Sequence, residues 1–126
     1  MPTLQVLLHD PAWRRPWRVL LLALLMAVSW LAFMPHPPDN QLPQGDKINH
    51  LLAFATLAAV ACLGLTPARR QAVAAAAGLL AYGGFIELVQ TQLPGRSGEW
   101  PDLLADGAGI ALGLAAAAAL RHLKRP

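Results

Sequence analysis

Residues 19–34, VLLLALLMAVSWLAFM, form a run of 16 side chains without a single charge. Three further apolar runs follow, at residues 48–65, 72–93 and 103–120. A helix that spans a membrane needs about 20 mostly apolar residues, within a range of about 17–25. Because lipid offers the backbone no hydrogen-bonding partners, each run is expected to be helical. The sequence therefore predicts an all-α integral membrane bundle of four transmembrane helices.

The composition of the 126-residue chain excludes other classes of protein. Hydrophobic residues make up 56% of it and charged residues 13%, whereas soluble domains carry about 25% charged residues. So much apolar surface excludes intrinsic disorder, and the single Cys62 excludes a disulfide framework within the chain. Residues 19–34 are longer than the apolar region of a signal peptide and lack an A-x-A-like cleavage site, so we expect a retained anchor.

The placement of Arg and Lys predicts the orientation of the bundle. Eight of the ten basic residues lie in the N-terminal flank, the loop after the second apolar run and the C-terminal tail, and the other two are Lys47 and Arg96. The positive-inside rule then places both termini in the cytoplasm. This topology accounts for the sequence pI of about 9.8. A nucleic-acid partner is not indicated, because the basic residues do not gather on one face with aromatic residues that could stack on bases. We divide the chain into an interfacial segment 1–18, a transmembrane domain 19–120 and a basic cytoplasmic tail 121–126.

Three ionisable side chains interrupt the apolar runs at one level of the predicted bundle. His50 lies near the start of the second run, Glu87 near the end of the third and Asp106 near the start of the fourth. At 1.5 Å rise per residue they lie about 6–9 Å from the outer ends of their helices. A carboxylate at the centre of a spanning helix costs about 2.5–3.5 kcal/mol, so such groups face the bundle interior, water or a partner. We therefore expect a polar pocket that faces outward, on the side opposite the termini.

Small residues in the last run predict a close contact between helices. Asp102 and Asp106 are four residues apart and share a helix face with Gly109 and Gly113. The Gly-x-x-x-Gly spacing of the two glycines is typical of close packing in membranes. We expect the third and fourth helices to pack there, and a homodimer through the same glycines is a further candidate contact.

Four short motifs, taken together and in order, resemble one family. They are DKINHLLAF at 46–54, Glu87-x-x-Gln90, Pro94-Gly95-Arg96 and DLLADGAG at 102–109. This combination is similar to the VanZ-like membrane proteins over residues from about 46 to 113. The resemblance implies a small helical protein of the bacterial cytoplasmic (inner) membrane, in a family named after a protein associated with resistance to the glycopeptide teicoplanin. It implies no particular reaction.

The charge of the predicted outer pocket indicates which ligands suit it. Two basic and five acidic side chains give it a net charge of −3 with His50 neutral. The basic ones are Lys47 and Arg96, and the acidic ones are Asp46, Glu87, Glu99, Asp102 and Asp106. Such a pocket suits a cation, a metal held by His and carboxylates, or carboxylates that share protons, rather than a bare phosphate. The metal-ligand candidates are His50, Glu87 and Asp106. The candidate ligand-binding residues are Asp46, Lys47, His50, Glu87, Gln90, Arg96, Asp102 and Asp106.

Three functions remain open from the sequence. The first, which we favour, is a non-enzymatic envelope protein that binds a lipid-linked or cell-wall-related ligand, or a glycopeptide, through Arg96 and Lys47. The second is a metal-dependent enzyme acting on a lipid-linked substrate, with His50 as general base. The third is a proton or cation pathway through Glu87, Asp106 and His50. No residue is assigned as catalytic, no cofactor is predicted beyond an optional divalent metal, and internal pairing of the carboxylates is the structural alternative.

Overall fold

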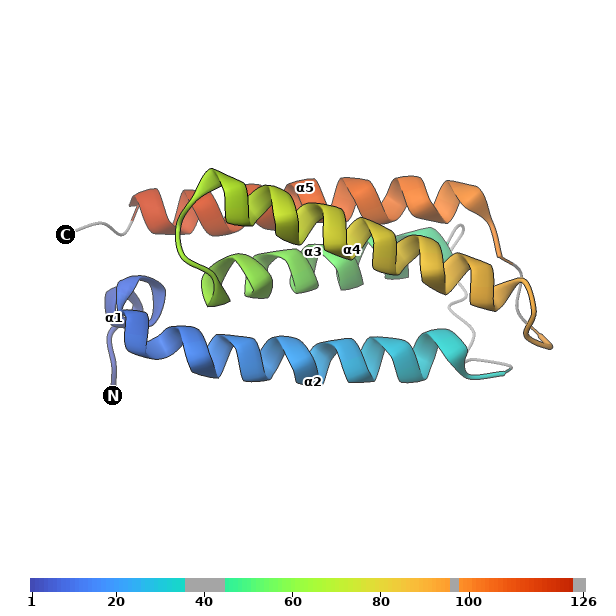
Figure 1. The fold of residues 1–126 in the computed structure, drawn as a ribbon, viewed down its shortest axis with the longest axis horizontal. Helices are drawn as coiled ribbons and strands as arrows, with labels where there is room; N and C mark the ends of the chain where they lie inside the picture. The colour runs from blue at the N-terminus through green and yellow to red at the C-terminus, as the bar shows by residue number, and fades with distance from the viewer. Residues whose placement is uncertain (36–44, 96–97, 124–126) are drawn as a thin grey trace.

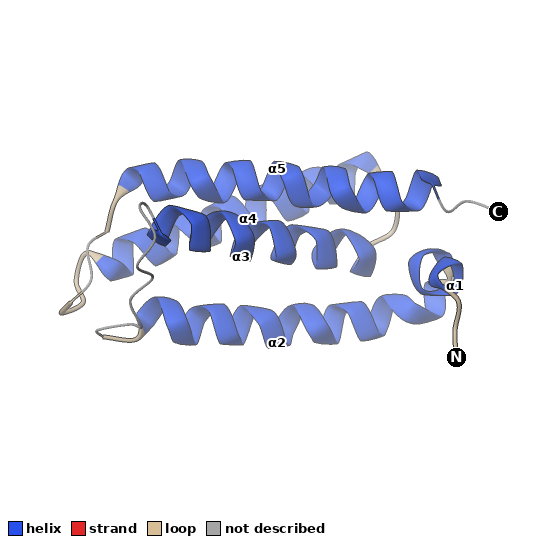
Figure 2. Ribbon diagram, turned by 180° about the vertical axis from the view of Figure 1, so that it is seen from behind, coloured by secondary structure: helices blue, strands red, loops and turns tan. Residues whose placement is uncertain are grey.

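The computed structural model describes residues 1–35, 45–95 and 98–123, and its regular elements in these ranges are all helical (Figures 1 and 2). A short helix and a 3-10 turn at the N-terminus precede four long helices. Each of the four long helices is long and apolar enough to cross a membrane, which confirms the predicted fold class. The elements are α1 (Leu4–His9), η1 (Pro11–Trp13), α2 (Arg14–Phe33), α3 (Gly45–Gly64), α4 (Arg69–Gln90) and α5 (Trp100–Leu123).

The helices begin earlier than the apolar runs that predicted them. Each of the four starts three to five residues before its run, since polar and amphipathic residues form the first turn. Asp46 and Asp102 lie in the first turns of α3 and α5, where the exposed N–H groups of the helix favour a carboxylate. The short α1 was not predicted. The Thr3 hydroxyl caps it by accepting from the Val6 N–H at 3.4 Å.

The closest helix contact joins α3 and α5 rather than α4 and α5. A Cβ on Gly109 would lie 2.4 Å from the carbonyl oxygen of Leu51, and one on Gly113 would lie 2.1 Å from that of Ala55. The two glycines therefore let the parallel helices α3 and α5 touch backbone to backbone. The expected packing of α4 at these glycines is wrong, because α3 occupies that face. Both glycines are buried inside the chain by this contact, and the candidate homodimer stays a prediction.

The helix α3 lies at the centre of the bundle and α2 lies on its flank (Figure 1). The core contains Phe54 and Leu57 of α3, Ile86 of α4 and Ile110 of α5. Only one face of α2 packs against this core, through Leu21, Leu24, Leu25 and Val28, while side chains such as Met26 and Trp30 stay exposed. An exposed apolar face of this kind is what a lipid-facing helix requires.

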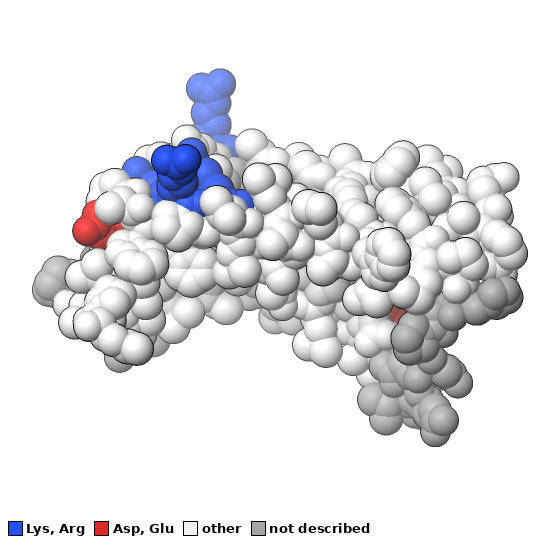
Figure 3. Space-filling view, turned by 90° about the horizontal axis from the view of Figure 1, so that it is seen from below, with Lys and Arg blue, Asp and Glu red and all other residues white. Residues whose placement is uncertain are grey.

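The two ends of the bundle differ in charge. Lys and Arg side chains gather at the end where the chain termini lie, beside one exposed acidic side chain, and a small acidic patch is visible between neighbouring atoms at the other end (Figure 3). At the basic end, Arg18 Nε donates to the Gly64 carbonyl at 2.8 Å, and the Arg121 guanidinium reaches the Leu63 and Leu65 carbonyls at 3.5 Å. These cations cap the C-terminus of α3, where the last carbonyls have no partner within the helix.

Candidate functional site

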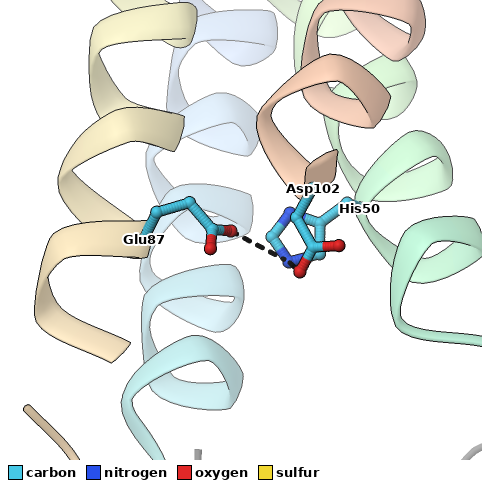
Figure 4. A group of neighbouring side chains, drawn as sticks. All are labelled: His50, Glu87 and Asp102. Carbon is cyan, nitrogen blue, oxygen red and sulfur yellow. Dashed lines mark ion pairs between the residues drawn. The ribbon is translucent and has the colours of Figure 1, made fainter. Parts of the chain in front are cut away.

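Three helices bring His50, Glu87 and Asp102 together at the end of the bundle opposite the termini (Figure 4). The side chains come from α3, α4 and α5 and point toward one another. His50 Nε2 lies 3.6 Å from Glu87 Oε1 and 3.7 Å from Asp102 Oδ2. Both carboxylates are almost fully buried, with 1% of Glu87 and 3% of Asp102 exposed. The distances exceed those of a hydrogen bond, so the imidazole is hydrogen-bonded to neither acid and, when protonated, forms an ion pair with each (Figure 4).

Asp106 holds the other side of the His50 ring. Its Oδ1 lies 2.6 Å from His50 Nδ1, which is the distance of a ring N–H donating to a carboxylate. The side chain of Asp106 is completely buried. Gly83 of α4 makes room for it, because a Cβ there would lie 2.5 Å from Asp106 Oδ2. With Nδ1 fixed by Asp106, Nε2 is the ring nitrogen that faces Glu87 and Asp102.

Glu87 connects α4 to the start of α5. Its Oε2 accepts a hydrogen bond from the backbone N–H of Glu99 at 2.9 Å. Glu99 immediately precedes α5, where backbone N–H groups lack partners within the helix. The carboxylate of Glu87 therefore caps a neighbouring helix with one oxygen and turns the other toward His50.

Lys47 forms the rim of the cluster together with two more exposed acids. Its ammonium lies 3.0 Å from Glu99 Oε2, 3.5 Å from Asp46 Oδ2 and 3.5 Å from Asp102 Oδ1. The side chains of Lys47, Glu99 and Asp46 are 29%, 44% and 51% exposed. We call these three residues the rim, and His50, Glu87, Asp102 and Asp106 the floor.

The floor contains more acceptors than the described residues can satisfy. Glu87 Oε1, Asp102 Oδ1 and Asp106 Oδ2 are buried and accept no hydrogen bond within residues 1–35, 45–95 and 98–123. Carboxylates only accept hydrogen bonds when ionised, and a buried acceptor without a donor is costly. The arrangement can therefore take up donors, protons or a cation.

An aromatic layer separates the floor from the rest of the bundle. The Phe54 ring lies parallel to that of His50, with 6.3 Å between centroids, and Tyr82 packs against Phe54 at 6.0 Å. The Tyr82 hydroxyl bonds to that of Ser29 on α2. Thr56, the next polar residue along α3, is exposed and bonds to the Leu52 carbonyl of its own helix. No described hydrogen bond therefore joins the floor to Thr56 or to the Tyr82–Ser29 pair behind Phe54.

The structure brings most of the predicted site residues into one cluster but not all of them. Gln90 is buried and donates to the Ala32 carbonyl at the end of α2, at 3.0 Å. It therefore joins α4 to α2 instead of entering the floor. Arg96 lies outside the described residues. Asp46, Lys47, His50, Glu87, Asp102 and Asp106 are all in the rim or the floor.

Two members of the site were missing from the sequence-based set. Glu99 had been counted in the charge of the pocket but not among its binding residues, although its position three residues before Asp102 was a usable signal. Phe54 closes the floor, and its spacing of four residues from His50 places both on one face of α3. The metal-ligand candidates also change, because Asp102 rather than Asp106 faces Nε2 of His50.

Comparison with known protein families covers most of the chain. The profile of the family described as VanZ/LLP1 matches residues 18–121, which include all four long helices and every residue of the rim and floor. Comparison with curated proteins and with solved structures gives no match.

Proposed function

We propose, for a chain that belongs to the VanZ/LLP1 family, a non-enzymatic role in the bacterial cell envelope. In this proposal the rim and floor bind the headgroup of a lipid-linked or cell-wall-related ligand. The observation that carries the proposal is a set of three buried carboxylate oxygens that accept no hydrogen bond from the described residues. They are Glu87 Oε1, Asp106 Oδ2 and Asp102 Oδ1, and only Asp102 Oδ1 has a lysine near it, at 3.5 Å. A bundle that needed only stability would gain by replacing such groups with apolar residues.

The chemistry of the cluster favours a ligand rich in donors. Among the described residues the cluster holds five carboxylates and one lysine, which pairs with only three of them, so the site presents acceptors to whatever enters it. Sugar hydroxyls, amide N–H groups and amines are such donors, and the headgroups of cell-wall precursors and glycopeptides carry all three. The ammonium of Lys47, which is partly exposed, supplies the one positive charge for an anionic group.

The proposed orientation places the site outside the cytoplasm. The described arginines at the other end include Arg14, Arg15, Arg69 and Arg70, and the positive-inside rule assigns that end to the cytoplasm. Both termini are then cytoplasmic, and the rim faces the outer leaflet of the inner membrane. A ligand carried by an outer-leaflet lipid would reach the rim without crossing the bilayer.

The alternatives from the sequence have less support. An enzyme that used a side-chain nucleophile would need it beside His50, and the described residues place no Ser or Cys there. A proton or cation pathway would need a continuous set of polar groups from the floor inward, and no described hydrogen bond joins the floor to the Tyr82–Ser29 pair behind Phe54. A site closed at its inner end fits a binding protein.

Native mass spectrometry of protein purified in mild detergent tests the proposal. We expect a co-purified lipid-linked ligand on the wild type and its loss in Lys47→Gln, because that change removes the only cation of the rim. Arg70→Gln, which removes the same charge at the other end of the bundle, is the matched control and should keep the ligand. Arg96→Ala tests the part of the prediction that lies outside the described residues.

Two results would argue against this function. A wild-type protein that carries no lipid other than bulk phospholipid would contradict ligand binding. Equal loss of ligand from the Lys47 and Arg70 variants would show that charge alone, rather than the site, retains it. The effect on antibiotics is measured separately, by comparing teicoplanin susceptibility in cells that express the wild type or Lys47→Gln.

A further inference from the structure

The floor and the rim each offer three possible ligand atoms for a metal ion, but the two sets are not equivalent. Asp46, Glu99 and Asp102 form the set at the rim. The Lys47 ammonium already lies within 3.5 Å of an oxygen of each, so this set has its cation. His50, Glu87 and Asp102 form the set at the floor, and their ligand atoms lie within 4.8 Å of one another. No described lysine or arginine reaches Glu87.

From this contrast we infer that the floor is a binding site for a divalent transition-metal ion such as Zn²⁺ or Mn²⁺, held by His50 Nε2, Glu87 Oε1 and Asp102. The clearest geometric support is the spacing of the ligand atoms. A tetrahedral ion with ligands at about 2.0–2.2 Å holds neighbouring ligand atoms roughly 3.4 Å apart. The observed separations from His50 Nε2 are 3.6 Å to Glu87 and 3.7 Å to Asp102. These atoms are too far apart to bond to one another and close to the spacing that an ion would impose.

The environment of the three ligands supports the same inference. Glu87 Oε1 is buried, points at His50 and has no hydrogen-bond partner among the described residues. Asp106 accepts from Nδ1 of the same imidazole at 2.6 Å. A histidine that binds a metal through one nitrogen commonly donates from the other to a carboxylate, which fixes the ring and makes it more basic. Asp106 is therefore a positioning residue and not a ligand.

The ligand set determines the class of ion and its open position. One imidazole and two carboxylates suit the first-row divalent ions better than Ca²⁺ or Mg²⁺, which prefer oxygen alone. Three protein ligands leave at least one coordination position, as in metal sites that bind a water or an external group. This inference deepens the proposed function and draws on the same cluster, since an ion at the floor would add the positive charge that attracts a phosphate-bearing headgroup.

Metal binding by the full chain in lipid-free detergent tests the inference. The protein is stripped with EDTA, and uptake of Mn²⁺ is followed by electron paramagnetic resonance and that of Zn²⁺ by equilibrium dialysis. We expect one ion per chain. Asp102→Asn should weaken binding by at least about 100-fold because it removes a ligand, and Asp106→Asn by about 10–100-fold because it removes the partner of the ligating histidine.

The control keeps the test specific to the floor. Asp10→Asn removes an acid at the other end of the bundle, where Asp10 caps η1, and should leave metal affinity unchanged. The absence of saturable uptake of both ions by the wild type would overturn the inference, and so would an Asp10→Asn variant as weak as Asp102→Asn. If Asp102→Asn does not fold, Glu87→Gln carries the same expectation. Because no lipid is present, failure here is distinguishable from failure of the proposed function, which is measured by the co-purified ligand.

Discussion

The two ends of the bundle handle charge in opposite ways. At the end with the termini, Arg18 and Arg121 direct their N–H groups at backbone carbonyls that terminate α3. The backbone carbonyls receive donors there, although the buried Arg121 Nε has no acceptor among the described residues, and the positive charges lie at the negative end of a helix dipole. At the other end, the described residues include five carboxylates with one lysine and one histidine, and three of the buried carboxylate oxygens accept no hydrogen bond from them.

This difference separates a structural use of charge from a functional one. The arginines satisfy backbone groups that the fold itself leaves open, so the fold accounts for them. The carboxylates exceed what α3, α4 and α5 require, since only one oxygen of Glu87 caps a helix. Substitutions at the basic end should therefore cost stability, whereas substitutions at the floor should cost binding and spare the fold.

The largest expected effect is on the contact that holds the two polar helices together. Gly113→Ala would place a Cβ 2.1 Å from the Ala55 carbonyl oxygen, so α3 and α5 must separate. We expect a loss of about 3 kcal/mol, at the upper end for overpacking, measured by thermal unfolding in detergent. Gly78→Ala is the control because nothing lies within 4 Å of its added Cβ. Equal melting temperatures of Gly113→Ala and Gly78→Ala would show that α3 and α5 are not in close contact at Gly113.

The second prediction concerns the stability change caused by a substitution at the floor, and a loss of stability in place of a gain would contradict the contrast between the two ends. Asp102→Asn removes one charge from a group of five carboxylates while Lys47 keeps Asp46 and Glu99 as partners. We expect the metal-free protein to hold its stability or gain about 0.5–2 kcal/mol, as when a binding residue is replaced. Chemical denaturation after EDTA treatment measures this change. A loss of more than about 1 kcal/mol would make Asp102 a structural partner and not a site residue.

The third effect tests the basic end. Arg18→Met keeps much of the side-chain volume but removes the hydrogen bond to the Gly64 carbonyl. We expect a loss of about 1 kcal/mol, typical of one hydrogen bond, with metal affinity unchanged. Arg15→Met, at an exposed position of the same helix, is the matched control. If Arg18→Met were as stable as Arg15→Met, the hydrogen bond of Arg18 to the Gly64 carbonyl would have no structural role.

The smallest effect concerns the layer between the two ends. Tyr82→Phe removes a hydroxyl that bonds to Ser29 and keeps the ring that packs on Phe54. Hydrogen bonds between helices in membranes average about 0.6 kcal/mol, so the melting temperature should fall only slightly. Metal affinity should not change, because Phe54 still closes the floor. A large drop in metal affinity would mean that the polar network continues past Phe54.

The sequence predicted the helices and the level of the site but not which helices touch. Apolar runs locate spans because the bilayer sets their length, and the end positions of His50, Glu87 and Asp106 follow from helical rise. A Gly-x-x-x-Gly pattern shows that some backbone approaches closely, yet carries no information on the partner. For that reason the contact at Gly109 was assigned to α4 when it belongs to α3.

Gln90 shows why individual roles are harder to predict than the cluster. Its spacing of three residues from Glu87 placed it on the polar face of α4. The Ala32 carbonyl lies in the last turn of α2, where the helix provides no donor, and Gln90 supplies one at 3.0 Å. This requirement comes from a helix far away in sequence. The same reason hid the pairing of His50 with Asp106, which are 56 positions apart.

The parallel contact of α3 with α5 has a consequence for how the protein is made. Ribosomes add about 5–20 residues per second, so Asp106 is synthesised roughly 3–11 s after His50, which precedes it by 56 positions. During that interval α3 has neither the carboxylate that holds its histidine nor the glycine face on which it rests. The polar cluster of the nascent chain therefore stays incomplete until α5 enters the bilayer. A chain whose synthesis stops after α4 lacks both Asp106 and the glycines that contact α3.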